Sequence, residues 1–189
     1  MLYYPKEGGA IMKKSEMKEV VRSAIAPKNL CRMFFKYDVN YRYYFPIQVS
    51  NKLFLGAEED DFILDGFSIR RFCDLTKVQI KDDKCIEIIR NEGILNNLSA
   101  PEVDLTDWHS VFLSLQRIGK NIIVEKESLD ETEWEFAIGH IEKVLKNKVL
   151  FRHFDADGIW QDSPHEISFS QITSVTFGSR YVEIFSKYV

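Results

Sequence analysis

Residues 53–80 read LFLGAEEDDFILDGFSIRRFCDLTKVQI, and residues 150–177 read LFRHFDADGIWQDSPHEISFSQITSVTF. When the two stretches are aligned without gaps, at a shift of 97 positions, seven of the 28 positions are identical. The identical pairs are Leu53 with Leu150, Phe54 with Phe151, Asp60 with Asp157, Asp65 with Asp162, Phe72 with Phe169, Thr76 with Thr173 and Val78 with Val175. Both stretches are rich in β-branched and aromatic residues, which is typical of strands. The match indicates that one β-rich unit occurs twice in the chain.

A segment with helical periodicity precedes each β-rich unit. In the first segment Ser15 is placed to cap a helix and Pro27 to end it, and one face carries Met17, Val20, Val21, Ala24 and Ile25. In the second segment Asp104 or Thr106 is the expected cap, Gly119 ends the helix, and the apolar face carries Leu105, Trp108, Val111, Phe112, Leu115 and Ile118. Each segment predicts an amphipathic helix that needs a partner surface.

Five short strands are predicted after each helix. The first set spans residues 31–37, 41–50, 52–57, 66–72 and 76–81, and the second spans 121–126, 133–144, 148–154, 165–169 and 172–177. Asn-Lys pairs at 51–52 and 147–148 predict a tight hairpin between the second and third strands of each set. Asp65-Gly66 and Asp157-Gly158 are predicted polar turns. Residues 83–90 and 180–188 fit either a short helix or a sixth strand.

A helix followed by five short strands resembles the Sm-like and SH3-like small barrels, in the element order of the Sm-like group. The resemblance implies a mainly β protein of two tandem small antiparallel β-barrels, each preceded by an amphipathic helix. Residues 91–104 contain Gly93, Ser99 and Pro101 and form the natural linker. The predicted units are therefore 13–98 and 99–189, packed side by side as separate units rather than as one continuous sheet.

The two ends of the chain carry further signals. The strings FDADGIW at 154–160 and FGSRY at 177–181 resemble a family of uncharacterised bacterial proteins, and this likeness brings no activity with it. Residues 6–9, Lys-Glu-Gly-Gly, are what a purine-rich ribosome-binding site would encode if translation were assigned to an upstream start. We therefore expect residues 1–12 to be a non-native or flexible extension and Met12 to be a candidate natural start, which the intact mass of the native protein would test.

Charge and cysteine usage bound the classes of function. The chain has 25 Lys and Arg against 29 Asp and Glu, a formal net charge of −4, which disfavours a surface that follows a nucleic-acid backbone throughout. Its three cysteines lack metal-binding spacing and are expected to be reduced, mostly buried thiols of a cytoplasmic protein. No apolar run approaches the roughly 20 residues that cross a bilayer, so we expect no membrane association.

Six residues are the best candidates for a ligand or partner surface: Arg32, Lys36, Arg42, Tyr43, Trp134 and Trp160. The first four lie where cations alternate with aromatic residues, a pattern that suits nucleic acid because rings stack on bases and cations bind phosphate. Filling of a barrel interior explains the same alternation. Trp134 and Trp160 are candidate anchors for a partner in the groove between the barrels.

Four histidines lie in the second half, at 109, 140, 153 and 165, near Asp155, Asp157 and Glu166. An acid/base or metal-dependent enzyme would require His140 and His153, on neighbouring predicted strands, to converge with these acids. The histidines lack metal-ligand spacing, and serine-hydrolase, P-loop and dinucleotide motifs are absent from the sequence. We expect no catalytic or metal-binding residues and no cofactor.

The sequence therefore predicts a non-catalytic binding or adaptor protein that acts through a protein partner or through self-association. The physical basis is that small barrels expose strand edges, which pair readily with other strands. An RNA-binding Sm-like protein is the alternative, although the net charge disfavours it. A metal-dependent or acid/base enzyme is the second alternative.

Overall fold

The computed structural model describes residues 12–189, and only the backbone of Asn97. The first half of the chain forms a helix, five strands, a second helix and a 3-10 turn, in the order α1 (Lys14–Ser23), β1 (Cys31–Phe35), β2 (Tyr41–Val49), β3 (Leu53–Asp60), β4 (Ile63–Arg71), β5 (Leu75–Ile80), α2 (Lys84–Asn91) and η1 (Ile94–Asn97). The predicted extension lies outside the described residues except for Met12, which packs against the core beneath α1.

The second half repeats the series of elements. It forms α3 (Trp108–Ile118), β6 (Ile122–Lys126), η2 (Glu131–Glu133), β7 (Glu135–Val144), β8 (Lys148–Phe154), β9 (His165–Ser168), β10 (Ser174–Phe177) and α4 (Arg180–Phe185). All ten predicted strands are present, with ends that differ by at most three residues. The two segments that fitted either helix or strand are helices, α2 and α4.

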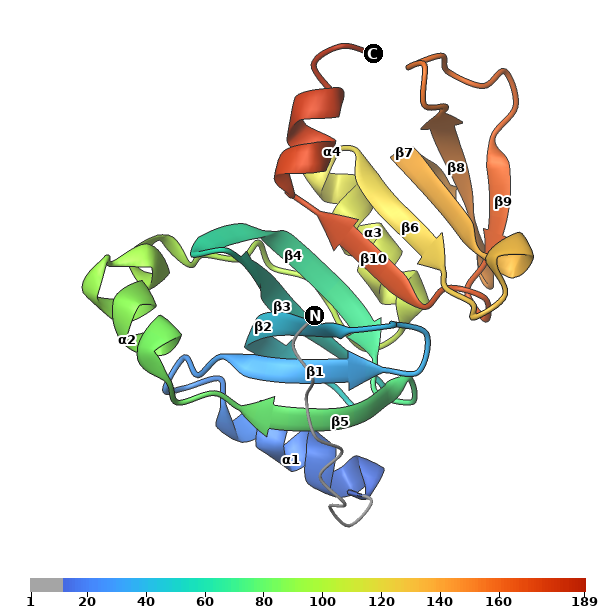
Figure 1. Cartoon of the computed structure of the whole chain (residues 1–189). Helices are drawn as coiled ribbons and strands as arrows, with labels where there is room; N and C mark the ends of the chain where they lie inside the picture. Colours follow the sequence, from blue (N-terminus) through green and yellow to red (C-terminus); the bar gives the residue numbers. More distant parts are fainter. Residues whose placement is uncertain (1–11) are drawn as a thin grey trace.

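All ten strands belong to one antiparallel sheet, in the order β5-β1-β2-β3-β4-β10-β6-β7-β8-β9 (Figure 1). The sheet is not closed into a barrel, so the prediction of two separate closed barrels is not confirmed. The reason is that β4 pairs along its outer edge with β10, which places Phe67 opposite Phe177 and Ile69 opposite Val175. Each half thus provides hydrogen-bond partners for one edge strand of the other half. The order of the strands is the same within the first five as within the last five.

The two halves also share local irregularities. The second and third strands of each half have a bulge at matching places, between Pro46 and Gln48 and between Ile141 and Lys143. At the bulges, equivalent residues of the two halves are 95 positions apart in the sequence, as Pro46 and Ile141 are. At the turns before the fifth strands, the equivalent residues Phe72 and Phe169 are 97 positions apart. The aligned pairs Leu53 with Leu150 and Phe54 with Phe151 are therefore two positions out of register, because the connection between the third and fourth strands is two residues longer in the second half.

The helix caps differ from those predicted. The backbone N–H of Lys13 donates to the Glu16 carboxylate at 2.9 Å, so α1 begins before Ser15. Asp107, rather than Asp104 or Thr106, caps α3 by accepting the Ser110 N–H at 2.9 Å. Asp104 instead accepts the backbone N–H and hydroxyl of Thr106 and shapes the chain before the helix.

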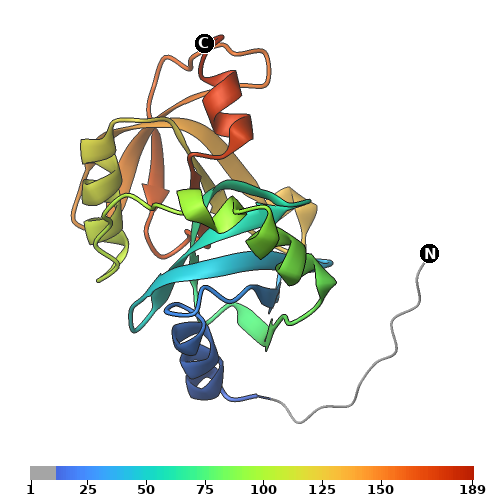
Figure 2. The same cartoon turned by 90° about the vertical axis from the view of Figure 1, so that its left-hand side faces the viewer.

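The main core includes residues from both halves. Val111 and Phe112 of α3 belong to one cluster with Leu55 and Ile69 of the first half and Phe151 of the second. A separate cluster lies under α1 and includes Met17, Val21 and Phe54. Figure 2 shows α1 and α4 at opposite ends of the molecule. Because the halves share a core, the whole chain is the unit for any experiment.

Candidate functional site

The structure does not bring the six predicted surface residues together. Arg32, Lys36, Arg42 and Tyr43 lie on or beside β1 and β2, whereas Trp134 and Trp160 lie in the second half. Trp134 is half exposed between η2 and β7. Trp160 packs against Phe154 and His140, with ring centroids 5.0 and 5.1 Å away. The two tryptophans therefore do not form one surface with the four residues of the first half.

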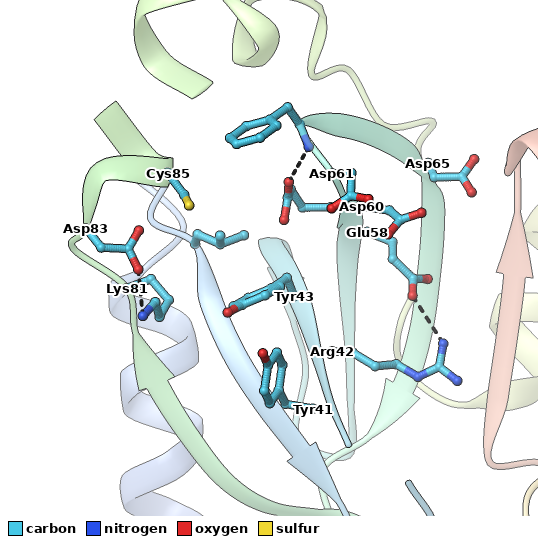
Figure 3. A pocket seen from close by; sticks show the side chains of 13 residues that line it. Tyr41, Arg42, Tyr43, Glu58, Asp60, Asp61, Asp65, Lys81, Asp83 and Cys85 are labelled. Atoms are coloured by element: carbon cyan, nitrogen blue, oxygen red, sulfur yellow. Dashed lines mark hydrogen bonds and ion pairs between the residues drawn. The ribbon is translucent and has the colours of Figure 1, made fainter. Parts of the chain in front are cut away.

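The predicted cations are held by neighbouring side chains. The Arg32 guanidinium lies 4.2 Å from the centre of the Tyr41 ring and donates to the Tyr43 hydroxyl at 2.8 Å. The Lys36 ammonium forms an ion pair with the buried carboxylate of Asp74 at 2.6 Å. Arg42 pairs with Asp38 and Glu58, at 3.3 and 3.2 Å. In Figure 3 the rings of Tyr41 and Tyr43 lie next to each other, whereas the side chain of Arg42 extends away from them.

An acidic pocket of about 490 Å³ lies beside these tyrosines (Figure 3). Its charged side chains are two cations, Arg42 and Lys81, and six carboxylates: Glu58, Glu59, Asp60, Asp61, Asp65 and Asp83. Burial raises the pKa of Glu59, and repulsion from neighbouring carboxylates adds to this increase. The hydrogen bond from the Phe62 N–H acts in the opposite direction. This surplus of negative charge disfavours binding of a nucleic-acid backbone near Arg42 and Tyr43, two of the residues on which the RNA-binding alternative was based.

The histidine pair proposed for an enzyme does not converge. His140 lies opposite Arg152, and His153 lies opposite Gly139, so the two imidazoles belong to neighbouring positions and opposite faces of the sheet. The ring of His153 faces His165 at 5.7 Å. Within residues 12–189, no group of three His, Cys, Asp or Glu side chains is arranged to hold a metal ion.

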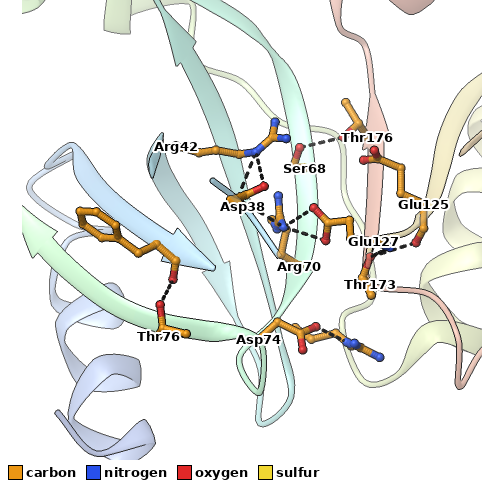
Figure 4. A network of polar contacts seen from close by, with 12 residues as sticks. Asp38, Arg42, Ser68, Arg70, Asp74, Thr76, Glu125, Glu127, Thr173 and Thr176 are labelled. Atoms are coloured by element: carbon orange, nitrogen blue, oxygen red, sulfur yellow. Dashed lines mark hydrogen bonds and ion pairs between the residues drawn. The ribbon is translucent and has the colours of Figure 1, made fainter. Parts of the chain in front are cut away.

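A buried charge cluster lies where the two halves meet (Figure 4). Nη2 of Arg70, on β4, donates to both carboxylate oxygens of Glu127 at 2.6 and 2.8 Å, and it lies 3.8 Å from Asp38. The Arg70 guanidinium also lies 3.8 Å from the centre of the Phe35 ring. Ser68 and Thr176 extend the contact through a hydroxyl pair at 2.9 Å.

The acids outnumber the cations in this cluster. Asp38, Glu58, Glu125 and Glu127 surround Arg42 and Arg70. Burial, followed by repulsion from Glu127, raises the pKa of Glu125 to about 7. Nε of Arg70 and the Tyr44 hydroxyl are buried without a hydrogen-bond partner among the described residues, and burial raises the pKa of Tyr44 to about 12. The cluster fixes the relative position of the halves.

A cleft of about 910 Å³ lies between the halves and is lined by three pairs of corresponding segments. One pair is the start of α1, with Lys14, Ser15 and Lys18, and the start of α3, with Asp107, Trp108 and His109. The second pair is the β2–β3 turn at 51–53 and the β7–β8 turn at 146–147. The third pair is the β4–β5 turn at 71–73 and the β9–β10 turn at 168–170. Both halves therefore contribute corresponding segments to the cleft.

The charged residues of the cleft are mostly basic. It is lined by five cations, Lys14, Lys18, Lys52, Arg71 and Lys146, against one carboxylate, Asp107, which caps α3. Lys14 and Lys18 donate to the backbone carbonyls of Leu75 and Asn51. Among these five cations, only Arg71 forms an ion pair with a carboxylate of the described chain, that of Asp74. In a chain with a net charge of −4, this concentration of positive charge favours an anion.

The walls of the cleft are aromatic. Phe72 and Trp108 are buried, and His109 and Phe169 are half-buried with ring centroids 6.2 Å apart. Phe169 is also stacked on Phe112 at 5.5 Å, which fixes the plane of its ring. A planar ring that enters the cleft would therefore meet fixed aromatic faces next to cations.

None of the six sequence candidates lines this cleft. Its residues come from six segments far apart in the chain, and only the topology places them together. The available signal was the pair of hairpin tips, Asn51-Lys52 and Lys146-Asn147, which carry the same two residue types in each half.

Comparisons with known proteins find no matching family model, no matching curated protein and no matching solved structure. Along residues 12–189, every helix is too short or too polar to cross a lipid bilayer. The candidate site therefore rests on its own geometry.

Proposed function

We propose that this protein is a non-catalytic binding protein whose cleft holds a nucleotide, either free or within single-stranded RNA. The observation that carries the proposal is the set of five cations around an aromatic-walled cleft with a single, already engaged carboxylate. Phosphate oxygens match the lysines and Arg71, and a base matches the aromatic walls. Three free cysteines support a cytoplasmic location.

The fold gives independent support. We interpret the halves as two copies of one Sm-like unit, because they share the strand order, the bulge between the second and third strands and the short helix after the fifth strand. The resemblance to Sm-like proteins implies RNA binding. The cleft then follows from the duplication, because corresponding turns of both copies meet there.

The electrostatics of the cleft favour an anion in particular. Partial burial lowers the pKa of Lys14 despite the opposing charge of the nearby Asp74 carboxylate, so an anion beside this ammonium would stabilise its charged form. Lys52 and Lys146 are exposed at the two hairpin tips, where they can reach phosphates without any change of the backbone. Binding should weaken as salt rises, because each phosphate contact releases counterions.

The test is fluorescence anisotropy with a labelled oligouridylate of about 10 nucleotides at roughly 20 mM salt. The double variant Lys52→Glu with Lys146→Glu should weaken binding about tenfold or more, since two attractive contacts become repulsive. Lys143→Glu is the matched control: the residue is exposed on β7, outside the cleft, and its reversal should leave the affinity within about twofold of wild type.

A competition experiment distinguishes the two candidate ligands, a free nucleotide and single-stranded RNA. If uridine or adenosine monophosphate displaces the oligonucleotide at comparable concentration, the ligand is a free nucleotide; if only longer strands compete, it is RNA. The proposal is wrong if neither binds at low salt, or if the Lys143→Glu control weakens binding as much as the cleft variant.

Protein binding, the function first expected from the sequence, is a second proposal, but free strand edges no longer support it. The continuous sheet uses one edge of each half, so the free edges are β5 and β9. β9 has four residues and follows Pro164, which cannot donate a backbone hydrogen bond, so this edge is a poor template for strand addition. A different surface supports a protein partner better.

A further inference from the structure

Helix α4 presents apolar residues on two faces. Val182 and Phe185 pack, with Val189 just beyond the helix, on a cluster that includes Ile123 and Phe154. The residue directly before each of these three is also apolar or aromatic and is largely exposed. These preceding residues are Tyr181, Ile184 and Tyr188, which are 55%, 47% and 81% exposed. A helix that is apolar on both sides is normally covered on both sides. The outer stripe of α4 is therefore a face without a partner among the described residues.

The fold does not require this outer stripe. In the first half, α2 occupies the corresponding place after β5, and its buried residues Ile86 and Ile89 match Val182 and Phe185. At the positions that correspond to Tyr181, Ile184 and Tyr188, α2 has the exposed Cys85, the half-buried Ile88 and the exposed Glu92. The same helix in the same fold thus accepts a more polar outer face, and the apolar stripe of α4 needs another explanation.

An acidic hairpin borders the stripe. A groove of about 570 Å³ is lined by Tyr181, Ile184, Phe185 and Tyr188 of the C-terminal segment and by Asp60 and Asp65 of the β3–β4 hairpin. Asp60 and Asp65 also line the acidic pocket (Figure 3), so the groove and the pocket share these two residues. Phe62 and Ile63, at the tip of the hairpin, add apolar side chains that are 41% and 44% exposed.

Much of the negative charge at this hairpin is uncompensated by cations. Arg42 is paired with Asp38 and Glu58, and Lys81 with Asp83. Within residues 12–189, Glu59 and Asp65 accept hydrogen bonds from backbone N–H groups alone, those of Phe62 and Arg180. Among the described residues, Arg180 is the cation that lines the groove itself. A partner with positive charge gains from this arrangement.

We propose that the outer face of α4 and the β3–β4 hairpin together bind a basic amphipathic segment of another protein. Its apolar side chains would cover Tyr181, Ile184 and Tyr188, and its Lys or Arg side chains would reach Asp60, Asp61 and Asp65. A second copy of this chain fits less well, because a two-fold contact would place the acidic hairpins of both copies near each other. The groove shares no lining residue with the cleft, so either site can fail without the other.

The probe is a fluorescein-labelled synthetic helix of about five turns, with Leu along one face and Lys on the other. Two control peptides have the same length: one replaces Lys by Glu, and the other replaces Leu by Ser. The full-length protein should bind the Leu/Lys peptide at least about tenfold more tightly than either control, because the surface offers both an apolar stripe and negative charge.

Two pairs of variants locate the contact. Tyr181→Ser with Ile184→Ser should weaken binding of the Leu/Lys peptide about tenfold, whereas Leu129→Ser, at a residue that is 77% exposed elsewhere, should not. Asp60→Asn with Asp61→Asn should weaken it about fivefold, whereas Glu131→Gln, an exposed acid in η2, should not. These exposed substitutions should leave the unfolding temperature unchanged, which separates lost binding from lost fold.

Three outcomes would overturn the proposal. The Leu/Glu peptide could bind as tightly as the Leu/Lys peptide, or the Tyr181 and Ile184 variant could bind the probe as wild type does. Alternatively, sedimentation could show a dimer that this variant dissociates, in which case the stripe is an interface between copies of this chain. Binding to neutral lipid vesicles that the same variant abolishes would assign the stripe to a membrane surface and would equally contradict a protein partner.

Discussion

Arg70 in the first half and Glu127 in the second form a buried ion pair in which one guanidinium nitrogen lies 2.6 and 2.8 Å from the two carboxylate oxygens. The pair lies beside the β4–β10 junction that makes one sheet of two five-strand segments (Figure 4). The Glu127 backbone N–H donates to Thr173, next to β10, at 2.9 Å. Side-chain charge and backbone pairing therefore hold the same junction.

Removing one partner of this pair should destabilise the protein strongly. Arg70→Ala leaves the Glu127 carboxylate buried without its cation, and the expected loss in the free energy of unfolding is about 3–5 kcal/mol. Urea unfolding of the full chain measures it. The double variant Arg70→Met with Glu127→Leu should lose less than the single variant, because no uncompensated charge remains. A double variant as unstable as Arg70→Ala would show that packing, rather than charge, dominates at this site.

The raised pKa of Glu125 makes stability depend on pH. Burial and the Glu127 charge raise this pKa from 4.5 to about 7, so the folded protein holds the proton more tightly than the unfolded chain does. The resulting stabilisation is complete below pH 4.5 and is lost as pH rises through about 7. Glu125→Gln cannot ionise, and at about pH 8 the variant should be more stable than wild type by on the order of 2 kcal/mol.

The measurement is the difference in the free energy of unfolding between Glu125→Gln and wild type from about pH 5 to pH 9. The difference should favour the variant increasingly across the neutral range. A constant difference would mean that Glu125 ionises as it does in water. Glu131→Gln, at an exposed acid in η2, is the control that should show no such trend.

The three cysteines should differ in reactivity. Burial raises the pKa of Cys31 to about 12, so this thiol is neutral and shielded, whereas Cys73 and Cys85 are exposed. A thiol reagent should therefore modify two cysteines in the native protein and the third only after unfolding. The sequence predicts mostly buried thiols, and the structure corrects this for Cys73 and Cys85, which lie in a turn and near the start of a short helix.

The same chemistry reports on the cleft. Cys73 lines the cleft, and Cys85 lines the acidic pocket. Saturating oligouridylate should slow modification of Cys73 at least about fivefold and leave Cys85 unchanged, when each is measured in a variant with Ser at the other position. Protection of Cys85 instead of Cys73 would place the ligand outside the cleft.

The strands could be predicted from sequence because their signals are local. Alternation and turn residues lie within each strand and hairpin, and all ten strands were found this way. The β4–β10 junction could not be predicted, because alternation shows which face of a strand is buried but not which edge another strand will occupy. For the same reason the cleft, built from Lys14 at one end of the sequence and Phe169 near the other, was missed.

One local prediction failed for a specific conformational reason. Asp65-Gly66 is typical of a turn, but both residues lie inside β4. The turn is at Asp61 and Phe62, which adopt φ values of 47° and 68° without any glycine. Sequence rules assign such a turn to Asn-Gly or Asp-Gly pairs, so the turn was predicted at Gly66 instead of at Asp61 and Phe62.

Gly66 has a different role, which leads to a last prediction. Its φ is +77°, and an added Cβ would lie 2.4 Å from the backbone nitrogen of Ser179, the residue that caps α4. Next to it, the Asp65 carboxylate accepts the Arg180 N–H at 2.6 Å. Gly66→Ala should therefore cost about 2–4 kcal/mol of unfolding free energy and displace the start of α4. Gly119→Ala, at φ +71° but with nothing within 4 Å of its added Cβ, isolates the backbone cost of about 1 kcal/mol. If urea unfolding gives the two variants equal losses, the close approach of β4 to α4 does not constrain the fold, and the α4 surface is less fixed than the docking proposal requires.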